Sequence, residues 1–281
     1  MIEKLNEEML DQYTKFVYDL NEQKQNRSGF CSTDKANIKK SLLSSLTNAH
    51  HQVWGYLTDD ELIGVLEVFV VPETKRADTN LFVRSRSIEV CQALMNEAQS
   101  HFPKDTDFHF FIDHRNEPIK NYLIAVNANH QGNEYQLVLA KKSMSRKPVG
   151  AIRLLEKTNH NQVITLHDET FGDVYISGQA LVNDHGKKRV VYTKTDAEKL
   201  IGYSVYKHGR NRATAEVICV NQTYQRQGHG TDLIQALINH AIDDKVDSLD
   251  LIVELENKRA LNLYLHLGFV VKDEFMAYTL L

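Results

Sequence analysis

Two copies of one sequence pattern constrain the fold of this chain more than any other feature. Leu-Ile-Gly follows a Thr-Asp turn at residues 58–64 and again at residues 195–202, with an offset of 200 − 62 = 138. The seven-residue segments that begin at Gln92 and Gln235 are identical at five positions, with an offset of 143. The chain has 281 residues, whereas a typical domain has about 100 to 150. The repeats therefore predict two domains that are divergent copies of one fold.

The boundary between the copies is expected within residues 141–150, because this segment is polar, basic and interrupted by Pro148. We predict domains at residues 1–145 and 146–281. In both copies, alternating apolar residues flank the polar turn, which is typical of a β-hairpin.

A glycine-rich turn at residues 225–230 joins the apolar run Val217–Val220 to an amphipathic helix that begins near Thr231. Gly228 and Gly230 carry no Cβ, so the backbone can bend tightly and bring its N–H groups against an anion. The following helix adds the positive end of its dipole and its unpaired first-turn donors. The turn is consistent with a phosphate site, although a strand-to-helix turn that merely needs small residues has the same pattern.

A second motif about thirty residues later supports the phosphate site. Asn257, Ala260 and Tyr264 form an N-x-x-A-x-x-x-Y pattern, and Gly268-Phe269 follows it. Together with the Q-x-x-G-x-G of residues 225–230, this pattern resembles the GNAT superfamily of acyl-CoA-dependent N-acyltransferases. The resemblance implies an α/β fold with two GNAT-like domains in tandem, each a mixed central sheet flanked by helices.

The resemblance also implies how acetyl-CoA would bind as the acyl donor. The backbone of residues 226–231 would hold the pyrophosphate, and the strand ending at Val220 would splay from the strand ending near Glu254. A backbone N–H near Val220 would then face the thioester oxygen. The expected donor-binding residues are Cys219, Val220, Gln225, Arg226, Gln227, Gly228, His229, Gly230, Thr231, Asn257, Ala260 and Tyr264.

Two residues are expected to be catalytic. Tyr264 matches the tyrosine that the family places beside the CoA sulfur, so it is the candidate general acid; alternatively it is a packed helix tyrosine with its hydroxyl on the backbone. Glu216 shares strand parity with Ile218 and Val220, which makes it the candidate base. It could instead be a surface residue or a partner for a lysine. Glu254 and His208 are weaker candidates for the base.

The N-terminal copy departs from the family pattern. With the offset of 143, Ser85 lies opposite Gly228 and Ser87 lies opposite Gly230. The segment 116–122 has Asn and Tyr six residues apart instead of seven, and it contains a proline. We therefore expect a degenerate domain that has lost cofactor binding and either shapes the acceptor cleft or stabilises the other half.

The composition is that of a globular chain, with 42% hydrophobic and 25% charged residues. It contains neither an apolar stretch of membrane-spanning length nor a signal peptide at Met1, so we expect a cytoplasmic protein with no membrane partner. Three separated cysteines and the absence of an H-E-x-x-H motif predict no metal site. A net charge of −4 predicts no nucleic-acid partner.

The expected function is acetyl-CoA-dependent transfer of an acetyl group to an amine of a small molecule or peptide, by direct attack in a ternary complex. The alternative is a non-catalytic module that senses acyl-CoA. The acceptor and the choice between monomer and homodimer are left open by the sequence.

Overall fold

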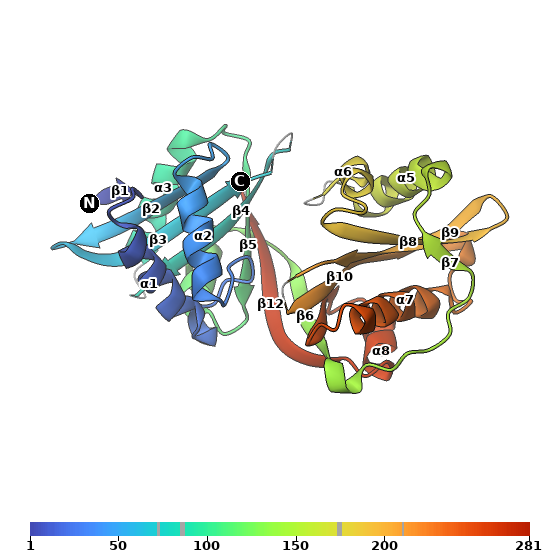
Figure 1. Ribbon diagram of the computed structural model, residues 1–281. Coiled ribbons are helices and arrows are strands. Elements are labelled where there is room, and N and C mark those ends of the chain that lie inside the picture. Colours follow the sequence, from blue (N-terminus) through green and yellow to red (C-terminus); the bar gives the residue numbers. More distant parts are fainter. Residues whose placement is uncertain (72–73, 85–87, 173–175, 210) are drawn as a thin grey trace. The chain divides into compact units, whose positions relative to one another are not determined.

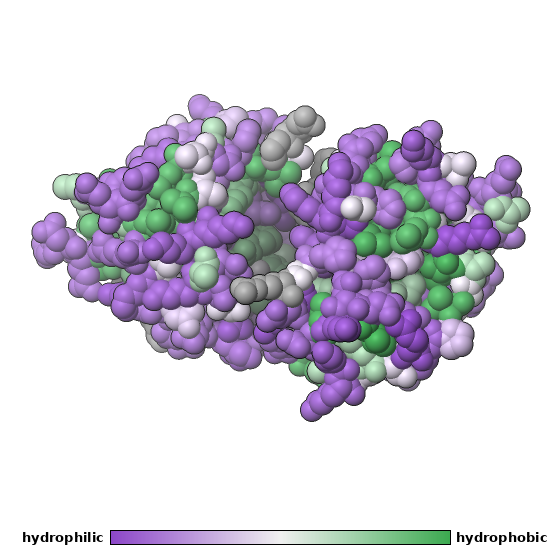
Figure 2. All heavy atoms as spheres, viewed as in Figure 1, coloured by the Kyte–Doolittle hydropathy of each residue, from purple (hydrophilic) through white to green (hydrophobic). Residues whose placement is uncertain are grey.

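The structure is a computed structural model that describes residues 1–71, 74–84, 88–172, 176–209 and 211–281. It divides into two compact units: residues 1–134 with residues 274–281, and residues 135–273. Each unit is a mixed sheet flanked by helices, which confirms the predicted fold class (Figure 1). Hydrophilic side chains cover most of the surface of each unit that is visible in Figure 2. No helix within the described ranges has the length and apolar character needed to cross a membrane.

In the first unit the strand order is β1-β2-β3-β4-β5-β12, and β4 and β5 are parallel neighbours. The strands are β1 (Ile2–Lys4), β2 (His51–Thr58), β3 (Glu61–Val70), β4 (Arg76–Val83), β5 (Asp107–Asp113) and β12 (Val270–Leu280). The helices are α1 (Leu10–Asn21), α2 (Lys35–Ser45), α3 (Ile88–His101) and α4 (Glu117–Ala125). Apolar residues of α1 and α2 pack on one face of the sheet, and those of α3 and α4 pack on the other.

In the second unit the strand order is β6-β11-β10-β9-β8-β7, and β10 and β11 are parallel neighbours. The strands are β6 (Asn129–Ala140), of which residues 135–140 belong to this unit, β7 (Ile152–Leu154), β8 (Arg189–Asp196), β9 (Lys199–Lys207), β10 (Arg212–Val220) and β11 (Ser248–Glu254). The helices are α5 (His160–Phe171), α6 (Gly178–Asn183), α7 (His229–Asp243) and α8 (Lys258–His266). As Figure 1 shows, α5 and α6 lie on one face of this sheet, and α7 and α8 lie on the other.

The β2–β3 and β8–β9 hairpins repeat one another residue by residue. The pairing shifts at Tyr56/Leu57 in the first hairpin and at Lys194/Thr195 in the second, and 194 − 56 = 138. The turns that follow have positive φ at Asp59 (48°) and at Ala197 (49°), again 138 residues apart. The sequence repeat therefore corresponds to a structural repeat that includes the bulge and the turn.

Helix α7 forms where the sequence predicts it, because its apolar residues recur on one face. Leu233, Ile234, Leu237, Ile238 and Ala241 are all buried. Ile234, Leu237, Ile238 and Ala241 pack against the sheet, and this packing fixes the direction of the first turn of the helix, where the glycine-rich segment ends.

The segment predicted as a linker, residues 141–150, packs along α7 within the second unit. Gln235 Nε2 donates to the Ser145 carbonyl at 2.9 Å, and Asn239 Nδ2 donates to the Lys147 carbonyl at 2.8 Å. Its basic residues include Arg146, which pairs with Asp243. The division between the units instead falls at residues 134 and 135, inside β6.

The C-terminal strand also departs from expectation. Residues 146–281 were predicted to form one domain, but Phe275–Leu280 of β12 pair in antiparallel fashion with Phe108–Asp113 of β5. Residues 274–281 therefore belong to the first unit, and the observed units are not the sequence-contiguous domains 1–145 and 146–281. The physical reason is that the parallel β4–β5 pair leaves the far edge of β5 unpaired, and β12 supplies the missing neighbour.

Candidate active site

Two residues with positive φ bend the turn between β10 and α7. Gly228 is the N-cap of α7, with φ 85° and ψ −5°, and Arg226 has φ 64°. A Cβ at Gly228 would meet no atom within 4 Å, so its left-handed backbone angle, rather than a lack of space, favours glycine there. At Gly230 an added Cβ would project between Leu263 and Val220, at 3.8 and 3.9 Å from their side chains. It would take up space that is open in the structure.

The turn presents a row of unpaired donors. The amides of Gln227, Gly228, His229 and Gly230 have no acceptor among the described residues, since the first helical amides bonded to the Gly228 carbonyl are those of Thr231 and Asp232. The buried Nδ1 atom of His229 also has no hydrogen-bond partner within the described ranges. Unpaired amides at a helix N-terminus favour an anion. A turn with these donors is therefore suited to a phosphate group.

A cavity of about 380 Å³ opens directly onto this turn. It is lined by ten of the twelve residues predicted to bind the donor: Val220, Gln225, Arg226, Gly228, His229, Gly230, Thr231, Asn257, Ala260 and Tyr264. Four further lining residues, Ile218, Tyr224, Arg259 and Leu263, were not predicted. Strand parity with Val220 could have found Ile218, and the position of Arg259 within the second motif could have found this cation. The structure thus brings both motifs together around one space.

The two strands beside the cavity pair over only part of their length. Arg212–Thr214 of β10 pair with Ser248–Asp250 of β11, and no pairing between these strands extends further among the described residues. The pairing of β10 with β9 on its other side has a β-bulge between Ala215 and Val217. This bulge directly follows Thr214, the last residue of β10 that pairs with β11. Bulges bend and twist a strand, which explains why β10 turns away from β11 at this point. The predicted splay of the two strands is therefore present.

The open edge of β10 carries unpaired backbone groups. The amide of Asn221 donates to the Ile201 carbonyl on the β9 side at 2.9 Å. Because successive residues of a strand direct their N–H groups to opposite edges, the amides of Ile218 and Val220 face the open edge. The side chain of Gln225 donates to the Val220 carbonyl from that side at 3.1 Å, in agreement with this direction.

Tyr264 lines the cavity with its side chain almost fully buried. Burial raises the pKa of its hydroxyl to about 12, so the group stays protonated throughout the neutral range. The hydroxyl makes no hydrogen bond to any described residue. This arrangement differs from the alternative in which the backbone would hold the hydroxyl, and it leaves the O–H free to donate to a group inside the cavity.

Asn257 and Gln225 hold the second motif against the first. The Asn257 side chain accepts from the Ala260 amide at 3.1 Å and caps α8. The Gln225 side chain, which donates to the Val220 carbonyl, also accepts from Arg259 at 3.2 Å. Gln225 therefore connects the end of β10 to the first turn of α8, a structural role that the motif alone does not disclose.

Two predicted donor-binding residues do not line the cavity. Cys219 points to the other face of the sheet, where its thiol lies 3.5 Å from the Thr170 hydroxyl and burial raises its pKa. The side chain of Gln227 turns back to the Thr223 carbonyl, so the unpaired backbone amide is the part of Gln227 that remains for an anion.

Glu216 also lies outside the cavity lining, and it is enclosed by cations. Arg189 pairs with its carboxylate through two nitrogens, one of them at 2.9 Å, and the Lys207 Nζ lies at 3.1 Å. Its side chain is 5% exposed, and Arg189 also pairs with Asp184. A buried carboxylate held by two cations is typical of a structural ion pair. This environment favours a structural ion pair over the predicted role as base.

The corresponding space in the first unit is filled by the chain itself. β4 and β5 pair over Arg76–Thr79 and Asp107–Phe110, and Ser28 then forms an antiparallel bridge with Ile112 of β5. Because Ile112 already pairs with β12 on its other edge, Ser28 lies on the β4 side. The segment of residues 27–29 thus occupies the edge of β5 beyond the parallel pairing.

Hydrogen bonds from both strands hold this segment. The Gly29 amide donates to the Phe111 carbonyl at 2.5 Å, and the Ser28 hydroxyl donates to Asn80 Oδ1 of β4 at 2.5 Å. Asn80 in turn donates to the buried Glu67 at 2.8 Å. The first unit thus lacks the open strand edge of the second. Ser85 and Ser87, which replace the glycines in sequence, lie outside the described residues.

Comparisons with known proteins agree with this geometry. The sequence model of the acetyltransferase (GNAT) family matches residues 155–269, and curated protein sequences gave no match. A GCN5-related N-acetyltransferase from Sphaerobacter thermophilus has a TM-score of 0.74 at 11% identity, over 100% of this chain and 95% of that chain. A tandem GNAT protein from the clavulanic acid biosynthesis pathway has a TM-score of 0.69 at 14% identity, over 100% of this chain and 98% of that one.

An acetyltransferase of the GNAT family from Colwellia psychrerythraea has a TM-score of 0.61 at 11% identity, with both chains covered completely. At these identities the likeness shows the fold alone, and the family assignment depends on the sequence model and the two motifs. The chain therefore carries, over residues 155–269, a domain of the acetyltransferase (GNAT) family, whose fold supports acyl transfer from acyl-CoA donors.

Proposed function

We propose that the protein is an acetyl-CoA-dependent N-acetyltransferase whose donor site is the cavity of the second unit. The observation that carries the proposal is the convergence of two sequence motifs on one cavity, with unpaired turn amides at one side and the free Tyr264 hydroxyl in its lining. The acetyl group would pass directly to an amine of a small molecule or peptide while both substrates are bound.

The diphosphate of the donor would bind at the turn. Four unpaired amides supply donors there, and the positive end of α7 adds to their attraction for an anion. The unpaired His229 Nδ1 adds a further donor when it carries the proton. Arg226 and Arg259 line the same cavity and add positive charge. Gly230 supports this binding mode because a side chain at that position would project into the space.

The pantetheine arm would pair with the open edge of β10, where the amides of Ile218 and Val220 have no strand neighbour among the described residues. An extended amide-containing arm can replace a missing strand in this way. One of these N–H groups would also donate to the thioester oxygen. That donor would stabilise the negative charge that develops when the amine attacks the acyl carbon.

The amine nitrogen forms a bond to the acyl carbon, and the carbon–sulfur bond then breaks. One proton must leave the nitrogen and one must reach the sulfur. A thiol has a reference pKa of about 8.5, so complete transfer of a proton from a hydroxyl of pKa about 12 is uphill by roughly 3.5 pKa units, or about 5 kcal/mol. Tyr264 would therefore donate a hydrogen bond to the departing sulfur and pass on its proton only as solvent replaces it, so that the proton on the sulfur comes, in net terms, from solvent.

The base is not assigned to Glu216 in this proposal, because two cations hold that carboxylate. Among the described residues, the lining of the cavity contains no carboxylate. An amine that reaches the cavity uncharged can attack without a protein base and release its proton to solvent.

The three cysteines form no disulfide, which supports a cytoplasmic location in this proposal.

The first unit is proposed to bind no donor, because residues 27–29 take the edge of β5 that a pantetheine arm would need. Each chain would then bind one molecule of CoA.

The lack of a carboxylate among the described lining residues also favours, as a second candidate, a module that binds acyl-CoA without turnover.

Thiol release from acetyl-CoA in the presence of a panel of amines tests the proposal. Release that depends on the amine, together with mass-spectrometric detection of an acetylated amine, is the expected result. Tight binding of acetyl-CoA with no amine-dependent release across the panel would contradict the enzyme and favour the acyl-CoA sensor.

A further inference from the structure

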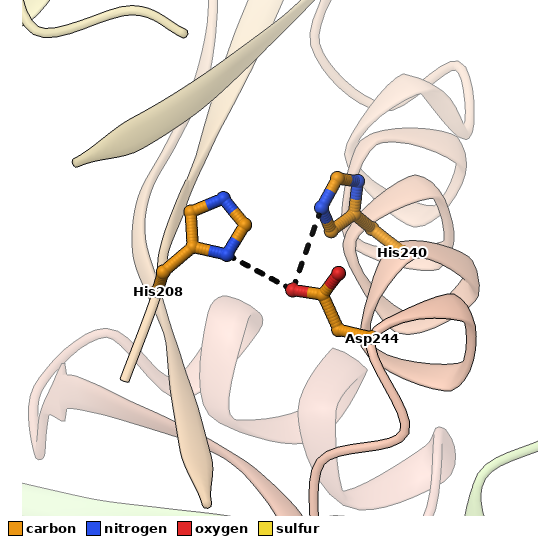
Figure 3. Close-up of side chains that lie close together, drawn as sticks. All are labelled: His208, His240 and Asp244. Atoms are coloured by element: carbon orange, nitrogen blue, oxygen red, sulfur yellow. Dashed lines mark ion pairs between the residues drawn. The ribbon is translucent and has the colours of Figure 1, made fainter. Parts of the chain in front are cut away.

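A second group of polar side chains lies at the opposite end of α7 from the cavity. His240 and Asp244 are one helical turn apart, and His208 follows the end of β9; Figure 3 shows the three side chains directed toward one another. One ligand-type atom from each residue lies within 4.8 Å of the other two. No other group of three His, Cys, Asp or Glu side chains in the described part of the chain has such a geometry.

The distances within this group are close to those that one metal ion requires. His208 Nδ1 lies 2.9 Å from Asp244 Oδ2, and His240 Nε2 lies 3.7 Å from the same oxygen. Ligand atoms bound tetrahedrally at about 2.0 to 2.1 Å are separated by roughly 3.4 Å. Small side-chain rotations would therefore bring all three atoms onto one ion.

The neighbouring residues resemble the outer shell of a metal site. The second ring nitrogen of His240, Nδ1, is hydrogen-bonded to the Tyr192 hydroxyl at 2.6 Å, and such a bond fixes the orientation and tautomer of a ligating imidazole. The other ring nitrogen of His240, Nε2, is the one that faces Asp244.

A buried tyrosine hydroxyl also faces the group. Tyr206 is fully buried, and its ring centroid lies 4.4 Å from the His240 ring and 5.1 Å from the His208 ring. Its hydroxyl lies near the Asp244 carboxylate, but it forms no hydrogen bond of standard geometry with any described residue. A water molecule on a bound ion would give this hydroxyl a well-aligned partner.

The position at the end of a helix favours a cation as well. Asp244 is the C-cap of α7, where the partial negative charge of the helix dipole is concentrated. His240 is eleven residues from His229, which corresponds to about 16 Å along the helix. An ion here would be remote from the donor cavity, so it would connect the end of β9 to α7 rather than take part in acyl transfer.

We propose that His208, His240 and Asp244 bind one divalent transition-metal ion of the Zn²⁺ type, with water in the remaining position. Two imidazoles and one carboxylate are the ligands that zinc accepts, whereas Mg²⁺ prefers oxygen ligands alone. The prediction of no metal site considered only compact sequence motifs. It could not detect this group because His208 is 32 residues before His240 in the sequence.

The test is calorimetric titration of the chelator-treated full chain with Zn²⁺, repeated with Mg²⁺ and followed by thermal unfolding. Co²⁺ serves as a spectroscopic probe. We expect one Zn²⁺ per chain, a raised Tm with Zn²⁺ and the visible absorption of low-coordinate Co²⁺. His208→Ala and Asp244→Asn should each weaken Zn²⁺ binding at least tenfold. His266→Ala, which removes an exposed histidine from the last turn of α8, should bind Zn²⁺ like the parent chain.

Three outcomes would overturn the site: no stoichiometric binding, binding that His208→Ala leaves unchanged, or equal affinity for Mg²⁺. His208→Ala keeps the test valid even if the Asp244 variant fails to fold, because the His208 side chain is 40% exposed. Acyl transfer by the second unit does not depend on this ion. Failure here would therefore leave the proposed function unaffected.

Discussion

Gly228 and Tyr264 support the donor site in different ways, one through its backbone and the other through its side chain. Gly228 sets the left-handed angle that turns four amides outward. Tyr264 presents a protonated hydroxyl to the same cavity. Substitution at the first position should therefore affect binding, and substitution at the second should affect the chemical step.

Gly228→Ala should weaken CoA binding at least tenfold, because a Cβ at φ 85° strains the turn by about 1–2 kcal/mol and shifts the amides. Gly186→Ala is the matched control. Gly186 also has positive φ, 75°, with no atom within 4 Å of an added Cβ, but it does not line the cavity. Calorimetry should find a loss of affinity in the first variant alone. Equal affinities of the two variants for CoA would show that the turn is not part of the donor site.

Tyr264→Phe should leave the Kd for CoA within about twofold of the parent value and lower kcat by about 10²-fold, the usual scale for a lost proton donor. Tyr122→Phe is the control, because Tyr122 is a buried tyrosine of α4 whose hydroxyl is also unpartnered among the described residues. Since the pKa of Tyr264 is raised to about 12, kcat of the parent enzyme should show no decline from this group below about pH 11. A Tyr264→Phe variant that kept the parental kcat would refute the assigned role.

The Glu216→Gln variant distinguishes a structural ion-pair role of Glu216 from a role as the general base. The substitution leaves Arg189 and Lys207 without a charged partner on β10, so it should lower the free energy of unfolding by roughly 3 kcal/mol. The pH profile of kcat for the folded fraction should keep its shape. If Glu216 were the base, kcat would instead fall by at least 10²-fold and the acidic limb of the profile would disappear.

At the scale of elements, the two units differ in what lies beside the strand edge where parallel pairing stops. β10 leaves β11 after Thr214 and its edge remains open, whereas the edge of β5 is taken by residues 27–29. Local rules predicted the hairpins and the amphipathic face of α7, because each depends on residues close in sequence. The bulge in β10 and the segment at β5 depend on long-range pairing, which a single sequence does not disclose.

Gly29→Val tests the segment that covers β5. A Cβ at residue 29 would lie 2.2 Å from the Phe111 ring, so the substitution should displace the segment and lower the Tm. Hydrogen exchange should increase at the Asp113 amide, which donates to the Arg27 carbonyl. CoA binding to the second unit should remain unchanged. Unaltered exchange at Asp113 would contradict the described contact.

Individual site residues were also predictable only where they depend on local sequence rather than on strand pairing. Ten of the twelve predicted donor-binding residues line one cavity because the family motifs specify them by spacing. Cys219 does not line the cavity because alternation along β10 sends its side chain to the opposite face from Val220. The partners of Glu216 come from β8 and β9, so its environment could be known only after the strands were aligned.

At the scale of the whole molecule, the C-terminal strand makes the first unit dependent on the end of the chain. Phe275–Leu280 supply the antiparallel neighbour of β5. A chain that ends at Asp273 should therefore lose hydrogen-exchange protection across Phe108–Asp113 and keep it in α7. If the amides of β5 stayed protected in the shortened chain, the pairing with β12 would not be what stabilises this strand.

The central claim is that one site per chain, at the turn before α7, binds coenzyme A. Isothermal titration calorimetry of the full-length chain with CoA tests it most directly. We predict one site per chain in the parent protein and an affinity that Gly228→Ala lowers at least tenfold while Gly186→Ala leaves it unchanged. Two sites per chain, or binding that survives Gly228→Ala unchanged, would contradict the account.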